Sequence, residues 1–498
     1  MPDHPTLSVD ALLNHALALH RAGRRDEAAS LYLQVTARDP GNAAAWPLLG
    51  MSQQASGDLA AAAKSFGKAV ALNPTDPRLR LQLIELLLRQ GRMRQAIDAA
   101  REARAVAPRN LDVRFALVRA LLAGDMKTEA VEANRAALAL AHDSLPRLDQ
   151  LATATRHALA LDPSFAEAWR TLSMMVKRDT HDEEMAIMER LFADPATSDV
   201  QRTQLGFALG RGFDDLGRWD EAFRYFAEGN RLKRAAIDFS IEDRLAEMAN
   251  IEHLFEGLPP LPAIRPGSRA PIFVVGLPRS GKTTIEHVLS RHPEIVAAGE
   301  LEALESVVSA FITDHGLDRP QSTLAPIPAA DWEQLGRAYL DKAGGEQAKL
   351  IVDTTPSNFR YVGFVRFALP GAKIIHTRRD PLEHDVALFQ KFFASAVYDY
   401  TYDLTELGAY RARYGRLMEL WRHAFPGFIL DIDVTDLATD PETGIRRLLE
   451  FCGLPWNPAC LDLRNVEQRL GEPATFVTAA SPLERLAPYS AHLAAVRT

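Results

Sequence analysis

A 34-residue period in glycine and proline is the strongest constraint that this sequence places on its fold. The residues that recur at this spacing are Gly23, Gly57 and Gly91, and Pro40, Pro74 and Pro108. Between them, the segment 46–74, WPLLGMSQQASGDLAAAAKSFGKAVALNP, has the pattern of two amphipathic helices joined at a glycine and closed by a proline. Proline ends a helix because it has no N–H to donate and its ring clashes with the preceding turn. Such a unit cannot bury its apolar face alone, so its copies must stack into an array.

The repeat unit carries further residues at fixed positions. Trp46, Leu49 and Gly50 form W-x-x-L-G, and Ala62 and Phe66 form A-x-x-x-F. The unit therefore resembles the tetratricopeptide repeat (TPR). Less regular copies at 158–175 and 216–234 extend the pattern, and we expect an α-helical superhelix of about six or seven units over residues 8–235. The resemblance implies a protein or peptide partner on the concave face of the array.

Composition narrows the classes of partner and compartment. The chain has 498 residues, which indicates more than one domain, and its net charge of −8 gives no reason to expect a nucleic-acid partner. Two cysteines, Cys452 and Cys460, are too few for a disulfide framework or a zinc site and suit a reducing compartment. The first residues lack the pattern of a signal peptide, and no apolar run is long enough to span a membrane. We therefore expect a cytoplasmic protein with no membrane span and no metal.

A change of pattern near residue 260 marks a second domain. Residues 236–258 read as helical and acidic, and the segment 258–271, LPPLPAIRPGSRAP, reads as an extended proline-rich linker. Four short apolar runs then alternate with helical stretches, at 272–276, 348–356, 371–381 and 427–437. This alternation predicts an α/β domain with a parallel sheet flanked by helices, in which ligands bind at the C-terminal ends of the strands. We place the repeat array at 1–235, a helix and linker at 236–270, and the α/β domain at 271–498.

The loop after the first of these runs carries the strongest chemical signal. Residues 276–283, GLPRSGKT, fit the phosphate-loop (P-loop) pattern G-x-x-x-x-G-K-[ST] between a strand and a helix. Two glycines permit the tight turns, and backbone N–H groups with the helix N-terminus make an anion nest. The candidate anion-binding residues are Arg279, Ser280, Gly281, Lys282, Thr283 and Thr284.

The α/β half resembles a known family of enzymes. The segments that carry the resemblance are PIFVVGLPRSG (271–281), HPEIVAAGELEAL (292–304), TTPSNFRYVGFVRFALPGAKIIHTRRDPLEH (354–384), YDYTYDLTELGAYRARYGRLMELWR (398–422) and PETGIRRLLEFCGLPWNPACL (441–461). In this order they resemble the TPR-linked sulfotransferases of bacteria, relatives of the tyrosylprotein sulfotransferases. The resemblance implies transfer of a sulfuryl group from 3′-phosphoadenylyl sulfate (PAPS) to a hydroxyl or amine. We expect the acceptor to be a protein or peptide held by the array, and a glycan or a small metabolite stays open as an alternative. It also implies that 279–283 hold the 5′-phosphosulfate, that Glu300 is the general base, and that Arg379 binds the 3′-phosphate.

The roles of the charged residues can also be argued from the chemistry. Negative charge grows on the leaving phosphate during sulfuryl transfer, and cations placed there stabilise the transition state. Arg279 and Lys282 suit this role. A carboxylate beside the acceptor can take its proton. Glu300 is the candidate, and the competing interpretation is a charge that stabilises a helix N-terminus.

Three departures from the family pattern leave other functions open. Lys282 replaces a threonine, Thr354 replaces a lysine, and Ala387 replaces a serine that helps to bind the 3′-phosphate. If the two loops face each other, Lys282 supplies the ammonium that Thr354 lacks. One alternative is an ATP- or GTP-dependent kinase or hydrolase, in which Asp353 helps to hold magnesium. The other is a non-catalytic TPR binding protein with a degenerate sulfotransferase domain.

Two further groups lie near these motifs. We expect His376 in a buried strand, whereas His384 could reach the site. The tyrosines of the segment 397–404, VYDYTYDL, are expected either to pack in the core or to line an acceptor cleft; they are Tyr398, Tyr400 and Tyr402.

Overall fold

The chain forms two compact units, Met1–Leu172 and Ser173–Thr498. The computed structural model describes residues 8–141, 148–258, 261–264, 270–319, 321–344, 350–462, 489–490 and 492–493. Most of the predicted proline-rich linker lies outside these residues. The units are described separately below.

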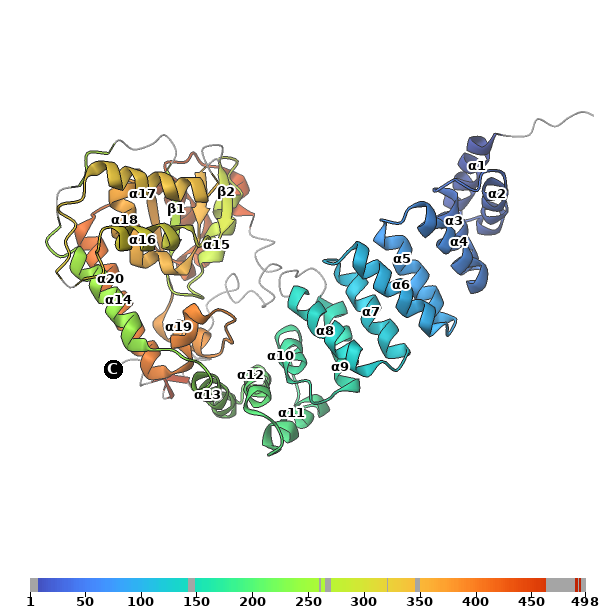
Figure 1. Ribbon diagram of the computed structural model, residues 1–498, viewed down its shortest axis with the longest axis horizontal. Helices are drawn as coiled ribbons and strands as arrows, with labels where there is room; N and C mark the ends of the chain where they lie inside the picture. Colours follow the sequence, from blue (N-terminus) through green and yellow to red (C-terminus); the bar gives the residue numbers. More distant parts are fainter. Residues whose placement is uncertain are drawn as a thin grey trace, which may run out of the picture. The chain divides into compact units, whose positions relative to one another are not determined.

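The first unit is an array of paired helices (Figure 1). The helices are α1 (Val9–Arg21), α2 (Arg25–Arg38), α3 (Ala45–Ala55), α4 (Leu59–Leu72), α5 (Pro77–Arg89), α6 (Met93–Val106), α7 (Leu111–Ala123), α8 (Lys127–Ala141) and α9 (Leu148–Leu161), followed by α10 (Ala166–Met175), which begins in this unit. Gly23, Gly57 and Gly91 end the first helix of three pairs with φ of 77°, 87° and 72°, a conformation that favours glycine. The predicted α-helical repeat array is confirmed.

A hydrogen bond to the proline carbonyl recurs with the repeat. The side chain six residues after the proline donates to its carbonyl oxygen in four units: Trp46 to Pro40 at 2.9 Å, Arg80 to Pro74 at 3.0 Å, Arg114 to Pro108 at 2.7 Å, and Trp169 to Pro163 at 2.7 Å. Tryptophan and arginine share little except a long side chain with an N–H group. In these four units, the position six residues after the proline therefore carries a side-chain N–H donor, which links the first helix of the unit to the turn before it.

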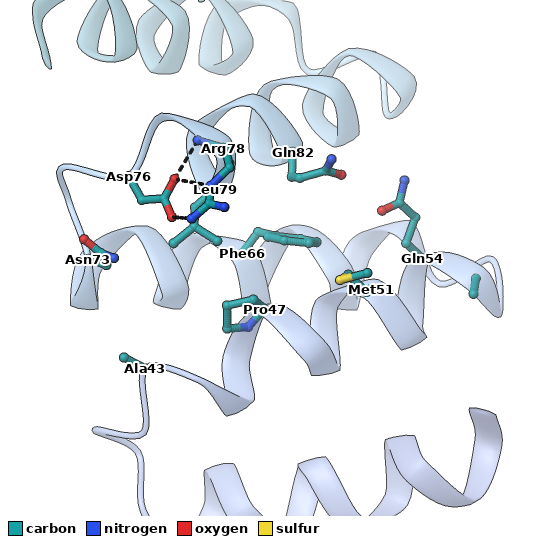
Figure 2. Close-up of a pocket in the computed structure, with 11 residues that line it drawn as sticks. Ala43, Pro47, Met51, Gln54, Phe66, Asn73, Asp76, Arg78, Leu79 and Gln82 are labelled. Atoms are coloured by element: carbon teal, nitrogen blue, oxygen red, sulfur yellow. Dashed lines mark hydrogen bonds and ion pairs between the residues drawn. The ribbon is translucent and has the colours of Figure 1, made fainter. Parts of the chain in front are cut away.

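A cavity of about 590 Å³ opens between α3, α4 and α5 (Figure 2). Pro47 and Met51 line it from α3, and Leu79 and Gln82 line it from α5. Met51 is 49% exposed, which is unusual for so apolar a side chain. At one end Arg78 donates to the Asp76 carboxylate at 2.9 Å. The cavity combines an apolar floor with amide and charged groups at its rim.

The second unit begins with helices of the repeat type. These are α11 (Glu183–Ala193), α12 (Asp199–Asp215), α13 (Trp219–Ala235) and α14 (Ile241–Leu254). Gly206 allows α12 and α13 to approach closely, because a Cβ there would lie 2.9 Å from the Tyr225 carbonyl oxygen. α13 also contacts the α/β domain: Asn230 donates to the Phe389 carbonyl at 2.9 Å, and Arg234 binds both oxygens of Glu406 at 2.8 and 2.7 Å. The compact unit therefore includes helices that the repeat pattern assigns to the array, and the division at residues 235 and 271 stays a prediction.

A five-stranded parallel sheet forms the centre of the α/β domain. In the order of the sheet, the strands are β2 (Ile295–Gly299), β3 (Leu350–Asp353), β1 (Ile272–Val275), β4 (Lys373–Arg378) and β5 (Ile429–Asp433). The four predicted strands and their parallel arrangement are confirmed. β2 was not predicted as a strand: it lies at an edge, and Val296 and Ala297 in it are exposed. Its sequence, IVAAG, is apolar, but three of its five residues are alanine or glycine, which favour strands only weakly, so it lacks the β-branched signal of the other strands.

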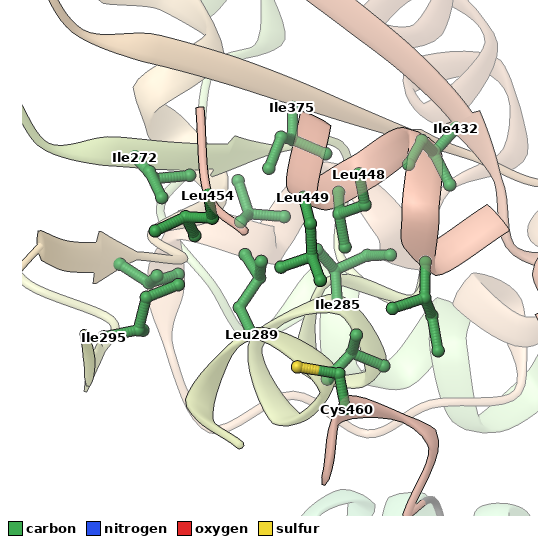
Figure 3. Packing of buried hydrophobic residues seen from close by; sticks show 14 of the residues in the cluster. Ile272, Ile285, Leu289, Ile295, Ile375, Ile432, Leu448, Leu449, Leu454 and Cys460 are labelled. Atoms are coloured by element: carbon green, nitrogen blue, oxygen red, sulfur yellow. The ribbon is translucent and has the colours of Figure 1, made fainter. Parts of the chain in front are cut away.

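Helices cover both faces of this sheet. They are α15 (Lys282–Ser290), α16 (Ala303–Asp314), α17 (Ala329–Lys342), α18 (Val362–Ala368), α19 (Pro381–Phe389), α20 (Leu404–Ala424), α21 (Val434–Thr439) and α22 (Pro441–Phe451), with short 3₁₀ segments η2 (Pro356–Tyr361), η3 (Ala396–Tyr402) and η4 (Pro458–Leu461). Ile272 points to the face covered by Ile285 of α15 and Leu448 of α22 (Figure 3). The next residue, Phe273, points to the other face and packs against Tyr339 of α17, with the rings tilted and their centroids 5.1 Å apart. The central strand is therefore buried on both sides, which fixes the loop that follows it.

No helix in the described part of the chain is both long and apolar enough to cross a membrane.

Candidate active site at the ends of the parallel strands

The P-loop follows β1, the central strand, and leads into α15. Gly276 and Gly281 have φ of 150° and 100°. A Cβ at Gly281 would lie 2.3 Å from Val434 Cγ1, and one at Gly276 would lie 2.6 Å from Ser280 Oγ. Both glycines are therefore required by close packing as well as by backbone conformation. Arg279, between them, has φ of 69°, which is uncommon for a residue with a side chain.

Hydrogen bonds from three side chains fix the conformation of the loop. Lys282 Nζ donates to the Leu277 carbonyl at 3.1 Å, and His384 Nε2 lies 2.8 Å from the Pro278 carbonyl oxygen. Ser280 Oγ lies 2.6 Å from Thr377 Oγ1, which itself donates to the Val275 carbonyl at 3.2 Å. Since Thr377 has one hydroxyl hydrogen, Ser280 is the donor in their contact. In this arrangement the Ser280 hydroxyl hydrogen is used within the protein, so its predicted contact with an anion requires rotation of the side chain.

Lys282 is the buried cation of the loop. Only 6% of its surface is exposed. Burial lowers the pKa of Lys282 to about 8, the charge of Glu300 opposes this change, and the charge of Arg279 adds to it. An ammonium with this pKa is mostly protonated at neutral pH. Its charge is destabilised by burial, and a bound anion would stabilise it. Thr283, at the next position, is exposed, whereas Thr284 is buried.

Glu300 follows β2 and faces the same region. Glu300 is exposed at the edge of the sheet, although neighbouring groups desolvate it enough to raise the pKa of its carboxyl group. The charge of Lys282 opposes this change, and the charge of Asp353 adds to it. Glu300 and Lys282 each affect the pKa of the other, and they follow β2 and β1, the two strands that flank β3, at the same edge of the sheet. The sequence predicted both residues, and the fold brings them together from opposite sides of β3. Glu300 as general base remains a prediction.

Asp353, at the end of β3, is fully buried and committed to protein donors. Its Oδ2 accepts from the Tyr339 hydroxyl at 3.1 Å, and its Oδ1 accepts from the Thr355 backbone N at 2.9 Å and the Thr355 hydroxyl at 2.7 Å. Burial is the main cause that raises the pKa of this carboxyl group. This is the carboxylate that an ATP-dependent mechanism would assign to magnesium. Its arrangement disfavours that role, because both oxygens already accept hydrogen bonds inside the protein.

Arg379 lies just beyond β4, beside the P-loop strand. Its Nε donates to Glu383 Oε2 at 2.9 Å, and both side chains are almost buried. The preceding Arg378 is exposed. Asp380 caps α19 by accepting from the Leu382 and Glu383 backbone N–H groups. The structure thus holds Arg379 at the carboxyl edge of the sheet, and its contact with a 3′-phosphate remains a prediction.

Of the remaining candidate residues, three are buried inside the domain and one, Tyr398, is half-exposed. His376 is buried in β4, as expected, and contacts Asp431 at 2.5 Å. Tyr400 and Tyr402 are also buried, and Tyr400 stacks on Tyr410 with ring centroids 3.7 Å apart. Tyr398 is half-exposed, and burial and the charge of Glu300 raise its pKa, so it lies on the Glu300 side of the site. The sequence did not separate Tyr398 from its neighbours, because all three share one alternating pattern.

A glycine-bounded anion loop at the end of the central parallel strand defines an α/β domain of the phosphate-loop class. A model described as the sulfotransferase family matches residues 271–458, and models of the tetratricopeptide repeat match residues 11–44, 53–100 and 81–144. The α/β domain is thus a member of the sulfotransferase family, joined to tetratricopeptide repeats.

The chain is also similar to individual proteins. An uncharacterized protein of Aquifex aeolicus (strain VF5) is 30% identical over 293 residues, which cover 56% of this chain and 38% of that protein. The protein-tyrosine sulfotransferase of Drosophila melanogaster is 22% identical over 210 residues, which cover 38% of this chain and 39% of that protein. The matches therefore span about two fifths of the length of these relatives. Among solved structures, MamA protein is 17% identical with a TM-score of 0.25, covering 47% of this chain and 96% of MamA.

Proposed function

We propose that this protein transfers a sulfuryl group from PAPS to a hydroxyl group on a protein or peptide. The observation that carries the proposal is the P-loop after β1, with buried Lys282 at the start of α15 and with Glu300 after β2 at the same edge of the sheet. A carboxylate whose pKa is raised is suited to act as a general base, and a cation held beside the leaving group stabilises its growing charge. The sulfotransferase-family match of the same domain supports the reaction class.

The proposed step moves the sulfuryl group in line between two oxygens. The acceptor oxygen forms a bond to sulfur, its proton goes to the Glu300 carboxylate, and the bond from sulfur to the 5′-phosphate oxygen breaks. Charge then grows on the departing phosphate. Lys282, Arg279 and the loop N–H groups stabilise that charge, since they are held in place before the reaction and need no rearrangement. We expect the interaction of the buried Lys282 ammonium with the anion to be especially favourable, because its charge is poorly solvated until the anion is present.

Arg379 is proposed to bind the 3′-phosphate of the donor. It lies at the carboxyl edge of β4, next to β1, where ligands of parallel sheets bind. Its guanidinium suits a phosphate because the planar group presents several N–H donors. Ala387 offers no hydroxyl in its support, so Arg379 would carry most of the preference for a 3′-phosphorylated nucleotide.

The proposed acceptor partner is a protein or peptide held by the repeat array. The cavity between α3, α4 and α5 supports this, since it combines exposed Met51 with amide groups at its rim. Apolar anchors beside amide donors suit an extended peptide, whose backbone needs hydrogen bonds along its length. Sulfation of a supplied peptide by the full chain, but not by residues 173–498 alone, is the expected result.

Thermal-shift titration of the full chain with 3′-phosphoadenosine 5′-phosphate and with ATP plus magnesium tests the reaction class. We expect the first nucleotide to raise the melting temperature, because a ligand that binds only the folded state stabilises it by mass action. Stabilisation by ATP and magnesium alone would instead favour a kinase or hydrolase. Stabilisation by neither would favour a non-catalytic binding protein. Release of 3′-phosphoadenosine 5′-phosphate from PAPS in the presence of acceptor completes the test.

A further inference from the structure

His384 reaches the P-loop from a different element. It lies on α19 with 7% of its surface exposed, and its Nε2 is 2.8 Å from the Pro278 carbonyl oxygen. A carbonyl group can only accept, so Nε2 carries the hydrogen in this bond. Burial, together with the positive charges of Arg411, Arg379 and Lys282, lowers the pKa of His384 to about 3. The ring is therefore neutral at physiological pH and acts as a fixed donor.

The bonded carbonyl belongs to the peptide group that joins Pro278 to Arg279. In a trans peptide group the C=O and the N–H point in opposite directions. A hydrogen bond that holds the carbonyl toward α19 therefore directs the Arg279 N–H away from α19. The orientation of that N–H matters in an anion nest, where backbone N–H groups are the ligands.

The same peptide group leads into a strained residue. Arg279 has φ of 69°, a conformation in which the Cβ of an L-residue is crowded by the backbone. Such a conformation persists only where the surroundings hold it. Glycines flank the loop at 276 and 281, but position 279 has a side chain, so the restraint must come from contacts. The hydrogen bond from His384 acts on the peptide group immediately before it.

We propose that His384 is a positioning residue for the donor anion. By holding the Pro278 carbonyl, it keeps the Arg279 N–H directed at the 5′-phosphosulfate and keeps Arg279 in its left-handed conformation. His384 acts through the loop backbone and does not touch the reacting atoms. This inference rests on the proposed function, because it takes the bound anion to be the 5′ group of PAPS.

Calorimetric titration of His384→Leu in the full chain tests the role. We expect the affinity for 3′-phosphoadenosine 5′-phosphate to fall about 10- to 100-fold, the effect of losing one hydrogen bond to a charged group. The affinity for adenosine 3′-phosphate, which has no 5′ anion, should change less than about twofold. His384→Gln can donate from its side-chain amide and should restore most of the affinity with an unchanged pH profile of turnover. Equal losses for both nucleotides would overturn the proposal in favour of a merely structural role.

A matched control comes from another buried histidine in the same unit. His292 is 2% exposed, and its Nε2 lies 3.1 Å from the Pro455 carbonyl oxygen, away from the P-loop. We expect His292→Leu to lower stability but to leave both nucleotide affinities unchanged. If the wild type binds neither nucleotide, the proposed function fails as well as this role in donor binding.

The backbone part of the inference has its own measurement. A crystal structure of His384→Leu should show Arg279 leaving positive φ. Retention of the left-handed conformation would overturn the backbone role whatever the enzyme transfers. If His384→Gln is as inactive as a general-base variant while still binding both nucleotides, His384 acts chemically and the positioning role is wrong.

Discussion

Lys282 and Glu300 act on each other as well as on a ligand. The charge of Glu300 favours the protonated form of Lys282, and the charge of Lys282 favours the ionised form of Glu300. Burial disfavours the charge of Lys282 and partial desolvation disfavours that of Glu300, and the opposite charge of the partner partly offsets each effect. Removing either one therefore changes the protonation of its partner in addition to losing its own contact.

The first prediction concerns pH. The ratio kcat/KM should rise with pH as Glu300 loses its proton and fall as Lys282 loses its proton near pH 8. Lys282→Arg keeps a positive charge above that pH, so its alkaline limb should move upward even if its maximum rate is lower. Initial rates from pH 5 to 10 provide the measurement. An alkaline limb that stays near pH 8 in Lys282→Arg would assign it to another group.

The second prediction separates a base from a helix-terminal charge. Glu300→Gln should lower kcat by about a hundred- to ten-thousand-fold, because a general base is lost, and should leave donor affinity nearly unchanged. Glu302→Gln is the control, since Glu302 is exposed at the start of α16 two residues away. It should cost about 0.3–1 kcal/mol of stability at most and no activity. Similar kinetics for the two variants would contradict the base assignment.

At the scale of elements, the P-loop depends on how tightly the strand, loop and helix fit. β1 is buried throughout, and α15 starts directly at Lys282, so the loop has little freedom to rearrange. Val434, at the start of α21, packs directly against Gly281. The P-loop is therefore shaped by an element that lies about 150 residues further along the sequence.

Gly281→Ala tests this fit. The positive φ alone should cost about 1–2 kcal/mol, and overlap with Val434 should add about 1–3 kcal/mol. Gly427→Ala is the control, because Gly427 has φ of 77° and nothing within 4 Å of its Cβ position. Gly427→Ala should lose only the about 1–2 kcal/mol that comes from the positive φ. Equal unfolding free energies for the two variants in urea would mean that the packing around Gly281 can relax.

At the scale of the molecule, the last repeat-type helices pack against the α/β domain as part of the same compact unit. α13 supplies Asn230 and Arg234 to the segment from α19 to α20, and Phe223 of α13 stacks on Phe389 with ring centroids 5.2 Å apart. The Tyr398 side of the site lies within that segment. These helices therefore support the wall of the site as well as continuing the repeat.

A pair of fragments tests this division. Residues 173–498 should fold and bind 3′-phosphoadenosine 5′-phosphate, because they form one compact unit. Residues 236–498 should aggregate or unfold at lower temperature, since removing α13 exposes Phe389 and leaves its carbonyl without the Asn230 donor. Circular dichroism melts and nucleotide titration give the comparison. A 236–498 fragment as stable as 173–498 would contradict it.

Much of the fold could be predicted from the sequence because its signals are short in range. The period glycines act on their own backbone, and the Trp46 and Arg80 side chains bind carbonyls only six residues away. The P-loop is likewise complete within eight residues, 276–283. The predicted strands are rich in β-branched residues, whereas three of the five residues of β2 are alanine or glycine, so β2 gave a weaker strand signal.

The sequence by itself thus determined the repeat array, the parallel α/β class and the residues of the anion loop. Only the tertiary structure decided which distant groups support that loop: Thr377 lies 97 residues from Ser280, and His384 lies 106 residues from Pro278. It also decided that Asp353 is buried and engaged, although its position after a strand is equally typical of a metal ligand. The physical reason is the distance along the sequence over which each property is set. Backbone conformation and helix or strand periodicity are set by neighbours a few residues apart, whereas hydrogen-bond partners, burial and pKa depend on which elements the packing brings together.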